Sequence, residues 1–245
     1  MGKGRGLRPD PQLKLLELTR QGRVSTLAEL AREIHTDPGS LARIIEDLNG
    51  EGRVSLSGGI VGLDARQRIA LAEQLIHLGR DPQRVSRFLE WQEFENFAMH
   101  SLEENGFHTA KHLVFRTRQG KREIDVLAWN DTFLFAVDCK HWLRGLSPSR
   151  LGAAADAQLE RSAALAERPE LLSRLGVKRP VRRRIMPILF ALGDPLQRVM
   201  NGVPVVSVSK LISFLFQLSP VDESFRSIPV KNLGIATLTD GEPKP

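Results

Sequence analysis

The sequence predicts an α+β protein, in which a mixed central sheet flanked by helices follows a small helical module. Three observations carry this prediction. Apolar residues recur at helical spacing as far as about residue 105, runs typical of strands begin at Phe107, and one further helical stretch separates those runs. A chain of 245 residues can bury one sizeable core with an appended module, or two small cores.

Composition excludes several classes of protein. Hydrophobic residues make up 41% and charged residues 26%, which is close to the average for globular proteins and argues against disorder. The longest apolar runs, 185–192 and 211–218, are too short to span a bilayer, and no apolar run follows the first residues as in a secretory signal. The single cysteine, Cys139, can form neither an internal disulfide nor a thiolate zinc site on its own. We therefore expect a cytoplasmic protein with no membrane partner.

The first 64 residues predict three short helices followed by a hairpin. Ser25 is the expected N-cap of the second helix, and Asp37–Ser40 is interpreted as a turn before the third. Two alternating runs around Gly58 and Gly59 predict the hairpin. The expected bounds are 11–21, 25–35 and 41–50 for the helices and 53–63 for the hairpin.

The pattern from Ala65 onward predicts two helices and then the elements of a sheet. The second helix is expected to end at the helix-stop pair Asn105–Gly106, and a turn at Gln119–Lys121 separates the first two strands. The expected bounds are 65–79 and 81–105 for the helices, 112–118, 123–129 and 133–141 for three strands, 151–172 for a helix, 185–192 and 203–208 for two strands and 211–218 for a last helix, with no regular element after Pro220.

The net charge of +6 is unevenly distributed along the chain. Residues 141–200 carry 11 basic and five acidic residues, residues 91–140 carry six and eight, and residues 1–64 sum to zero. Basic flanks around a small acidic centre are typical of a protein that binds a polyanion and holds cations at its middle. Ordinary solvated charge is the alternative.

Four charged residues lie at chemically informative positions. Glu95 lies on the helix that precedes the strands, Asp125 lies in the second strand, and Asp138 and Lys140 lie in the third. Because side chains two apart in a strand face the same side, Asp138 and Lys140 point together while Cys139 points away. Three acids in a core-facing position repel each other unless a cation neutralises them. Alternatively, Asp125 and Asp138 bond loop amides and Lys140 pairs with one of them.

This arrangement resembles the PD-(D/E)xK nuclease superfamily, in particular its restriction endonuclease-like and archaeal Holliday junction resolvase-like members. In that pattern an acid opens the second strand, an acid-x-lysine closes the third, and a glutamate often comes from the preceding helix. The resemblance covers residues 90–218, although Ile124 stands where the family name has proline and the acid before x-Lys is Asp rather than the commoner Glu. It implies a restriction endonuclease-like αβββαβ core. The catalytic residues it implies are Glu95, Asp125, Asp138 and Lys140.

The same resemblance implies phosphodiester hydrolysis with Mg²⁺ or Mn²⁺. Hard carboxylate oxygens bind such cations, which polarise the phosphoryl oxygen and lower the pKa of a bound water. Asp125 would be the central ligand, and Asp138 with the backbone carbonyl of Cys139 would complete the protein shell. Glu95 would bind through a water or hold a second ion. Lys140 would orient the attacking water or stabilise the charge that develops on the phosphate.

The N-terminal elements resemble a winged helix-turn-helix over residues 1–64. In that family the third helix enters the major groove, which would present Ser40 and Arg43 to DNA. Because Glu46 and Asp47 lie beside Arg43, a protein-binding or dimerisation wing is the alternative. The implied domains are this module, a helical linker over 65–90, a nuclease domain over 91–220 and a tail over 221–245.

Further residues are candidates for contact with nucleic acid. Gln158 and Arg161 lie on the helix after the core strands, and four basic residues flank the second-strand hairpin. The densest basic run, 178–184, is a candidate phosphate track, with a solvated loop as the alternative. The candidates are Arg43, Arg116, Arg118, Lys121, Arg122, Gln158, Arg161, Arg182, Arg183 and Arg184.

We therefore expect a Mg²⁺-dependent DNA endonuclease acting in repair, recombination or defence. One alternative is a structure-specific nuclease of the Holliday junction type, usually a homodimer with paired active sites. A second is a DNA-binding regulator whose nuclease core is inactive, and a third is an RNA nuclease. No GxxxxGK[ST] occurs, so the chain carries no ATP-driven motor of its own.

Overall fold

The order of helices and strands along the chain follows the sequence prediction in most places. The structure is a computed structural model and describes residues 10–142, 147–177, 184–219 and 224–231. The described helices are α1 (Pro11–Leu18), α2 (Leu27–Glu33), α3 (Pro38–Gly50), α4 (Ala65–His77), α5 (Pro82–Ser86), α6 (Trp91–Glu104), α7 (Pro148–Ala166), α8 (Pro169–Arg174) and α9 (Leu211–Gln217). The described strands are β1 (Ser25–Thr26), β2 (Ser55–Ser57), β3 (Ile60–Gly62), β4 (His108–Thr117), β5 (Gly120–Trp129), β6 (Leu134–Lys140), β7 (Arg184–Ala191), β8 (Val199–Met200), β9 (Val203–Ser207) and β10 (Ile228–Pro229).

A mixed sheet organises the second half of the chain. Among the described residues its strand order is β4-β5-β6-β7-β9-β8, and β10 pairs with β7. β4, β5 and β6 are antiparallel neighbours, whereas β6, β7 and β9 run parallel. The chain is therefore an α+β protein with a mixed multi-stranded sheet, as expected.

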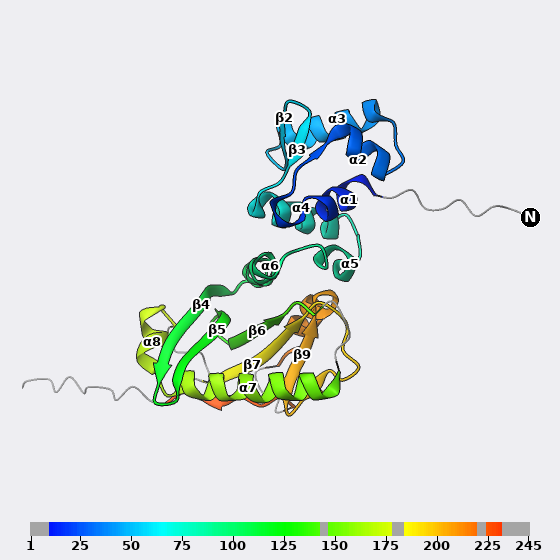
Figure 1. Cartoon of the computed structure of the whole chain (residues 1–245). Coiled ribbons are helices and arrows are strands. Elements are labelled where there is room, and N and C mark those ends of the chain that lie inside the picture. Colours follow the sequence, from blue (N-terminus) through cyan, green and yellow to red (C-terminus); the bar gives the residue numbers. More distant parts are fainter. Residues whose placement is uncertain (1–9, 143–146, 178–183, 220–223, 232–245) are drawn as a thin grey trace, which may run out of the picture.

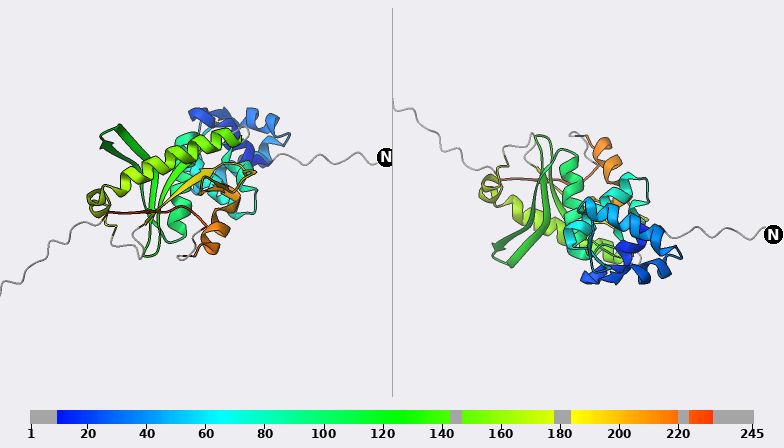
Figure 2. Two further views of the ribbon diagram at one scale, coloured as in Figure 1. Left: turned by 90° about the horizontal axis from the view of Figure 1, so that it is seen from below. Right: turned by 90° about the horizontal axis from the view of Figure 1, so that it is seen from above.

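Helices cover both faces of this sheet. Figure 1 shows α6 above the sheet and α7 along its lower side, and the views in Figure 2 agree. Phe94 of α6 packs in one hydrophobic cluster with Phe135 and Val137, while Leu165 of α7 packs in another with Ala136. Alternate residues of β6 thus face opposite helices, as the two-residue period of a strand requires. None of the described helices is long and apolar enough to cross a membrane.

The N-terminal module contains α1, α2, α3 and a three-stranded sheet of order β1-β3-β2. The predicted hairpin is confirmed as β2 and β3, and β1 is an additional strand. Ser25 was expected to cap α2, but it lies in β1, and Thr26 is the N-cap because its side chain and that of Glu29 form a capping box. Asp37–Ser40 is not a separate turn, because the Asp37 carboxylate caps α3 and the helix begins at Pro38.

The helix expected over 81–105 is two helices, α5 and α6, separated at residues 87–90. Contacts from outside the helix account for the break. The fully buried Arg68 of α4 donates to the carbonyl of Phe88 at 2.5 Å, and the Glu93 carboxylate accepts from the Glu90 N–H at 2.7 Å. The second contact opens α6 at Trp91, which brings Glu95 into its first turns.

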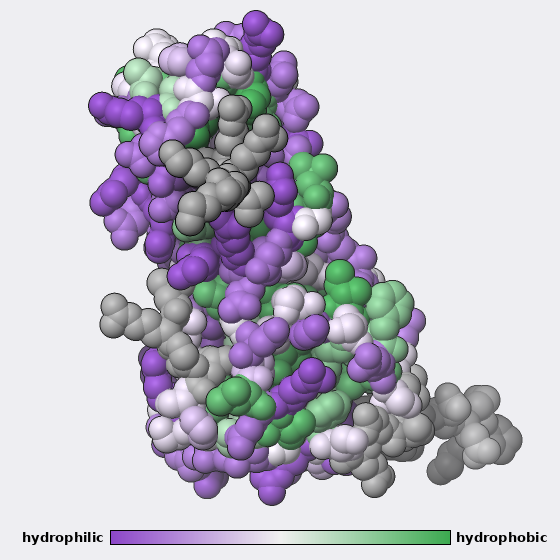
Figure 3. Space-filling view, turned by 90° about the vertical axis from the view of Figure 1, so that its right-hand side faces the viewer, coloured by the Kyte–Doolittle hydropathy of each residue, from purple (hydrophilic) through white to green (hydrophobic). Residues whose placement is uncertain are grey.

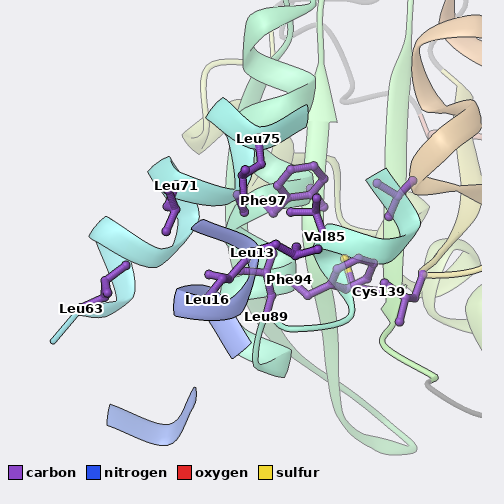
Figure 4. Packing of buried hydrophobic residues seen from close by; sticks show 14 of the residues in the cluster. Leu13, Leu16, Leu63, Leu71, Leu75, Val85, Leu89, Phe94, Phe97 and Cys139 are labelled. Carbon is purple, nitrogen blue, oxygen red and sulfur yellow. The ribbon is translucent and has the colours of Figure 1, made fainter. Parts of the chain in front are cut away.

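Arg68 also fastens α1 to this junction. Its guanidinium bonds Glu93 at 2.8 Å, the Leu16 carbonyl at 2.7 Å and the Thr19 hydroxyl at 2.7 Å. Around it, leucines of α1 and α4 pack against the apolar side of α6, as Figure 4 shows for Leu13, Leu71 and Phe97. The segment expected as a linker, 65–90, therefore contributes α4 and α5 to a continuous core that reaches the sheet.

Three expectations for the C-terminal half are also corrected. The helix expected over 151–172 begins earlier, at Pro148 with Ser147 as its N-cap, and Pro169 separates it from α8 because proline cannot continue a helix. A short strand, β8, precedes β9. An element does follow Pro220, since β10 pairs with the first residues of β7.

Candidate functional site

The sheet opens at the level of Asp125. The register of β4 and β5 sets Asp125 across from His112, and that of β5 and β6 sets it across from Asp138, but neither pair is bridged. The β5–β6 ladder ends at Val126 and Val137. Beyond this level β5 continues beside β4, and β6 continues beside β7. The two central strands thus separate and leave Asp125 and Asp138 at the point of divergence.

Asp125 accepts a hydrogen bond across this opening. Its Oδ2 receives the backbone N–H of Cys139 at 2.8 Å, a contact that replaces the missing ladder bond. Burial raises the pKa of the Asp125 carboxyl, and the nearby Asp138 raises it further, while the Cys139 N–H acts in the opposite direction. Asp125 is thereby a strand carboxylate whose charged form is destabilised.

Asp138 is buried and held by two cations. Lys140 Nζ lies 2.8 Å from its Oδ2, and Arg161 Nη2 lies 2.6 Å from its Oδ1. Asp138 and Lys140 therefore lie on the same face of β6, as alternation predicts. Gln158 is fully buried and donates to the Ala136 carbonyl at 2.7 Å, while its own oxygen accepts from Arg161 at 2.9 Å. Gln158 thus positions Arg161 from α7.

Glu95 approaches the opening from α6. Its residue is 1% exposed, and among the described residues neither carboxylate oxygen has a hydrogen-bond partner. Burial raises the pKa of Glu95 to about 7, and repulsion from Asp125 contributes to the shift. A buried carboxylate without hydrogen bonds is unstable as an anion, so this position is suited to a proton or a cation.

His112 is a site residue that the sequence reasoning missed. Its Nε2 lies 3.5 Å from Glu95 Oε2, and its Nδ1 lies 2.9 Å from Glu123 Oε1. The backbone φ of His112 is 52°, a left-handed conformation that interrupts the ladder opposite Asp125. The β4–β5 hairpin could have indicated this contact. With the centre of its turn at residues 118–119, the antiparallel register places residue 112 of β4 opposite residue 125 of β5.

The acids line a cleft of about 770 Å³ between the diverging strands. Basic side chains and two tryptophans share its walls. Its lining residues are Trp91, Lys121, Arg122, Glu123, Asp125, Asp138, Cys139, Lys140, His141, Trp142, Ala157, Glu160 and Arg161. The cleft therefore brings Asp125, Asp138 and Lys140 together with Arg161, whereas Glu95 is not among the residues that line it.

The Cys139 side chain belongs to the core and not to the chemistry. It is 2% exposed and packs in the cluster that contains Phe94, and Figure 4 shows its sulfur among apolar side chains. Burial raises the pKa of the thiol well above its usual value, with Asp125 and Glu95 acting in the same direction. A thiolate nucleophile at this position is therefore disfavoured.

A cation would find its ligands among Glu95, Asp125 and Asp138. As they stand, however, no group of three or more His, Cys, Asp or Glu side chains in the described part of the chain is arranged to hold a metal ion. In the structure Lys140 and Arg161 instead pair with the two oxygens of Asp138.

The other candidate contacts to nucleic acid are scattered. Arg116, Arg118 and Lys121 are exposed on the β4–β5 hairpin, and Arg43 is exposed on α3. Arg184 bonds the hydroxyl and the carbonyl of Ser227, so it secures β10 beside β7. Arg182 and Arg183 lie outside the described residues.

A second cavity, of about 570 Å³, lies near α9 and is lined by residues that include Asp194, Ser207 and Phe214. The hydrogen bond from Ser207 lowers the pKa of Asp194. Exposed apolar residues occur in the same part of the chain, with Leu196 at 92% and Phe216 at 83% exposure. Figure 3, which views this side of the molecule, shows apolar side chains spread over its lower half.

Comparison with known proteins identifies one relative by sequence. No family model matches the chain. It is 32% identical over 131 residues to an uncharacterized protein of Archaeoglobus fulgidus, a match that covers 53% of this chain and 92% of the archaeal protein. The chain belongs to the family of that archaeal protein.

Two solved structures are similar to this family member at low sequence identity. A protein of unknown function, AF1548, matches with a TM-score of 0.33 and 16% identity over 49% of this chain. Protein VC1899 from Vibrio cholerae matches with a TM-score of 0.37 and 14% identity over 84% of this chain. The matches span 58% and 50% of the lengths of those two chains.

Proposed function

We propose that this protein is a divalent-cation-dependent DNA nuclease with a restriction endonuclease-like core. One observation carries the proposal: two diverging strands bring Asp125 and Asp138 to one opening in the sheet with Lys140 beside them, and Glu95 of α6 lies next to His112, across from Asp125. A structural sheet edge has no need for three neighbouring carboxylates of which two are hard to ionise. The order of elements around them agrees with the αβββαβ arrangement that the sequence resembles.

The donor chemistry of these residues suits Mg²⁺ or Mn²⁺ once Asp138 is released from one of its ion pairs. Both oxygens of the buried Glu95 lack a hydrogen-bond partner among the described residues, and carboxylate oxygens are the ligands that these hard cations prefer. Burial is the main cause that raises the pKa of Glu95 and of Asp125, and repulsion from a neighbouring carboxylate adds to it; a cation would offset that repulsion. Asp125 and Glu95 would hold it, and Asp138 would join them by giving up one ion pair. When bound, the cation supplies Lewis-acid stabilisation and a more acidic water.

The chain's own cations complete the site. Lys140 is one-quarter exposed, so its ammonium can reach a phosphate while it still neutralises Asp138. Arg161, fixed by Gln158, would remain paired with Asp138 when Lys140 turns to the substrate. Both groups would stabilise the negative charge that develops on the phosphate during hydrolysis.

The N-terminal module is proposed as a winged helix-turn-helix that selects the substrate. α3 exposes Ser40 and Arg43 at its N-terminal half, as a recognition helix does, and β2 and β3 form the wing. A protein partner, including a second copy of the chain, is the alternative occupant of this surface.

A cleavage panel tests the function. Linear duplex, single-stranded, branched and junction DNA are incubated with the protein in Mg²⁺, in Mn²⁺ and in EDTA. We expect cleavage only with a cation, and its loss in Asp125→Asn. The matched control is Asp131→Asn, which removes an exposed acid from the turn between β5 and β6. Full cleavage by Asp125→Asn overturns the assignment, and binding without cleavage by the wild type favours an inactive DNA-binding regulator.

A further inference from the structure

The size of the cleft limits what can reach the acids. Asp138 is 3% exposed and lies on a cleft of about 770 Å³, which is within the range of pockets that hold a small ligand. A segment of duplex is much larger than this space. A single strand can enter between β5 and β6 and bring a phosphate to Asp138, whereas a duplex would have to present its backbone from outside the cleft.

Two tryptophans stand on the walls of this cleft. Trp91, at the first position of α6, is 50% exposed, and Trp142 follows the end of β6. The guanidinium of Arg150 lies 4.7 Å from the centre of the Trp142 ring, and the Lys140 ammonium lies 6.0 Å from it. Aromatic rings beside cations form the stacking surfaces on which proteins bind unpaired bases.

The charges of the cleft favour stacking over electrostatic attraction. Four cationic side chains, Lys121, Arg122, Lys140 and Arg161, line it together with four acids, Glu123, Asp125, Asp138 and Glu160. Among the described lining residues these formal charges balance, so this part of the cleft is not strongly basic. The apolar faces of the tryptophans must then supply much of the affinity.

We propose that the DNA is unpaired at the point of cleavage, and that its bases stack on Trp91 and Trp142 while the backbone crosses Asp125 and Asp138. This inference rests on the proposed nuclease function. It narrows the substrate to single strands and to duplexes that carry an unpaired stretch.

Binding is measured without cleavage, in EDTA, with a fluorescein-labelled dT oligonucleotide and a blunt duplex of equal length. We expect the single strand to bind more tightly and to quench tryptophan fluorescence. Trp91→Ala should weaken single-strand binding about tenfold or more, because stacking contributes on the order of five- to 100-fold per base. The salt dependence should remain unchanged, since no charge is removed. Trp91→Phe should retain most of the affinity.

Phe216→Ala provides the matched control, because it removes an aromatic ring that is 83% exposed and is not among the residues lining the cleft. Circular dichroism confirms that each variant is folded. Equal binding and cleavage of single strand and duplex, with no effect of Trp91→Ala, overturns the inference and leaves the nuclease function standing. The opposite result is also informative. If single strands bind in a way that depends on Trp91 but no substrate is cleaved, the binding inference holds and the nuclease function fails.

Discussion

At the residue scale, the site is dominated by the cost of keeping Glu95 ionised. Its carboxylate lies in the protein interior with His112 3.5 Å away, too far for a good hydrogen bond. The neighbouring Asp125 repels the Glu95 anion. Asp138 is already paired with Lys140 and Arg161. Stability should therefore respond to pH and to divalent cations.

The first prediction concerns this pH dependence. The pKa of Glu95 is raised from 4.5 to about 7 in the folded protein. The native state then binds more protons than the unfolded state between these values, so the contribution of Glu95 to stability is fully present below pH 4.5 and is lost as the pH rises through 7. The loss attributable to Glu95 is at most about 3 to 4 kcal/mol, since one pKa unit corresponds to about 1.4 kcal/mol.

Urea denaturation in EDTA at pH 5.5 and pH 8 measures this loss of stability. The glutamine variant, Glu95→Gln, should lose less stability than the wild type between the two pH values, because the amide does not ionise. Adding Mg²⁺ at pH 8 should restore part of the wild-type loss. An unchanged pH slope in Glu95→Gln would contradict the burial argument.

The second prediction concerns Lys140. Lys140→Ala should lower the cleavage rate by about 100-fold, the scale expected when one positioned electrostatic group is removed. Stability should change little, because Arg161 still neutralises Asp138. Single-turnover cleavage and thermal unfolding are measured together, with Lys14→Ala on α1 as the control lysine. If Lys140→Ala cleaves as fast as the wild type, the role of Lys140 is only to form the ion pair with Asp138.

At the element scale, a single arginine ties the N-terminal helices to the helix that carries Glu95. Arg68 joins α1, α4, the α5–α6 junction and α6 through Leu16, Thr19, Phe88 and Glu93. Its side chain is 2% exposed, so each of these bonds is shielded from water. The placement of α6 therefore depends on the module that precedes it.

The third prediction tests this junction. Arg68→Ala should destabilise the protein by about 3–5 kcal/mol, because it leaves Glu93 as a buried unpaired charge. The control is Arg66→Ala, one exposed position on the same helix, which should stay within about 0.5 kcal/mol of the wild type. Urea denaturation of both variants gives the two values. Equal stabilities would mean that Glu93 finds another partner or takes up a proton.

At the scale of the whole molecule, the continuous hydrophobic core joins the N-terminal module to the part of the chain that contains the large sheet. The core therefore limits which truncated forms can be used to study either part alone. A truncation at Ala65 would remove the Leu16 and Thr19 partners of Arg68 and uncover leucines of α4. Surface substitutions in the full chain are therefore the sound way to divide DNA binding between its parts.

The fourth prediction concerns how much of the DNA affinity comes from the β4–β5 hairpin and how much from α3. Replacing Arg116, Arg118 and Lys121 with alanine should weaken duplex binding and lower its salt slope by up to about 0.9 per lost phosphate contact. Arg43→Ala should alter the preference among DNA structures more than the slope, if α3 is the recognition helix. Titrations across salt concentrations measure both. A large slope change in Arg43→Ala and none in the triple variant would make the N-terminal module the DNA anchor.

Much of the fold could be predicted from local pattern. Apolar spacing located α4, β6, β7 and β9 to within a few residues, and strand alternation set Asp138 and Lys140 on one face, away from Cys139. These features depend on neighbours two to four positions apart, which the chain itself specifies. The resemblance to the PD-(D/E)xK pattern, rather than local spacing, brought Glu95, Asp125 and Asp138 forward as one candidate site.

Only the tertiary structure decided which distant groups meet. His112 reaches Glu95 because strand register sets it opposite Asp125, and Arg161 reaches Asp138 because α7 crosses beneath β6. The break before α6 arises from Arg68, whose bonds join elements up to 52 residues apart. Periodicity reports the burial of a side chain but not the identity of its partner. That identity follows from packing and register, because the free energy of a buried charge depends on groups far away in the chain.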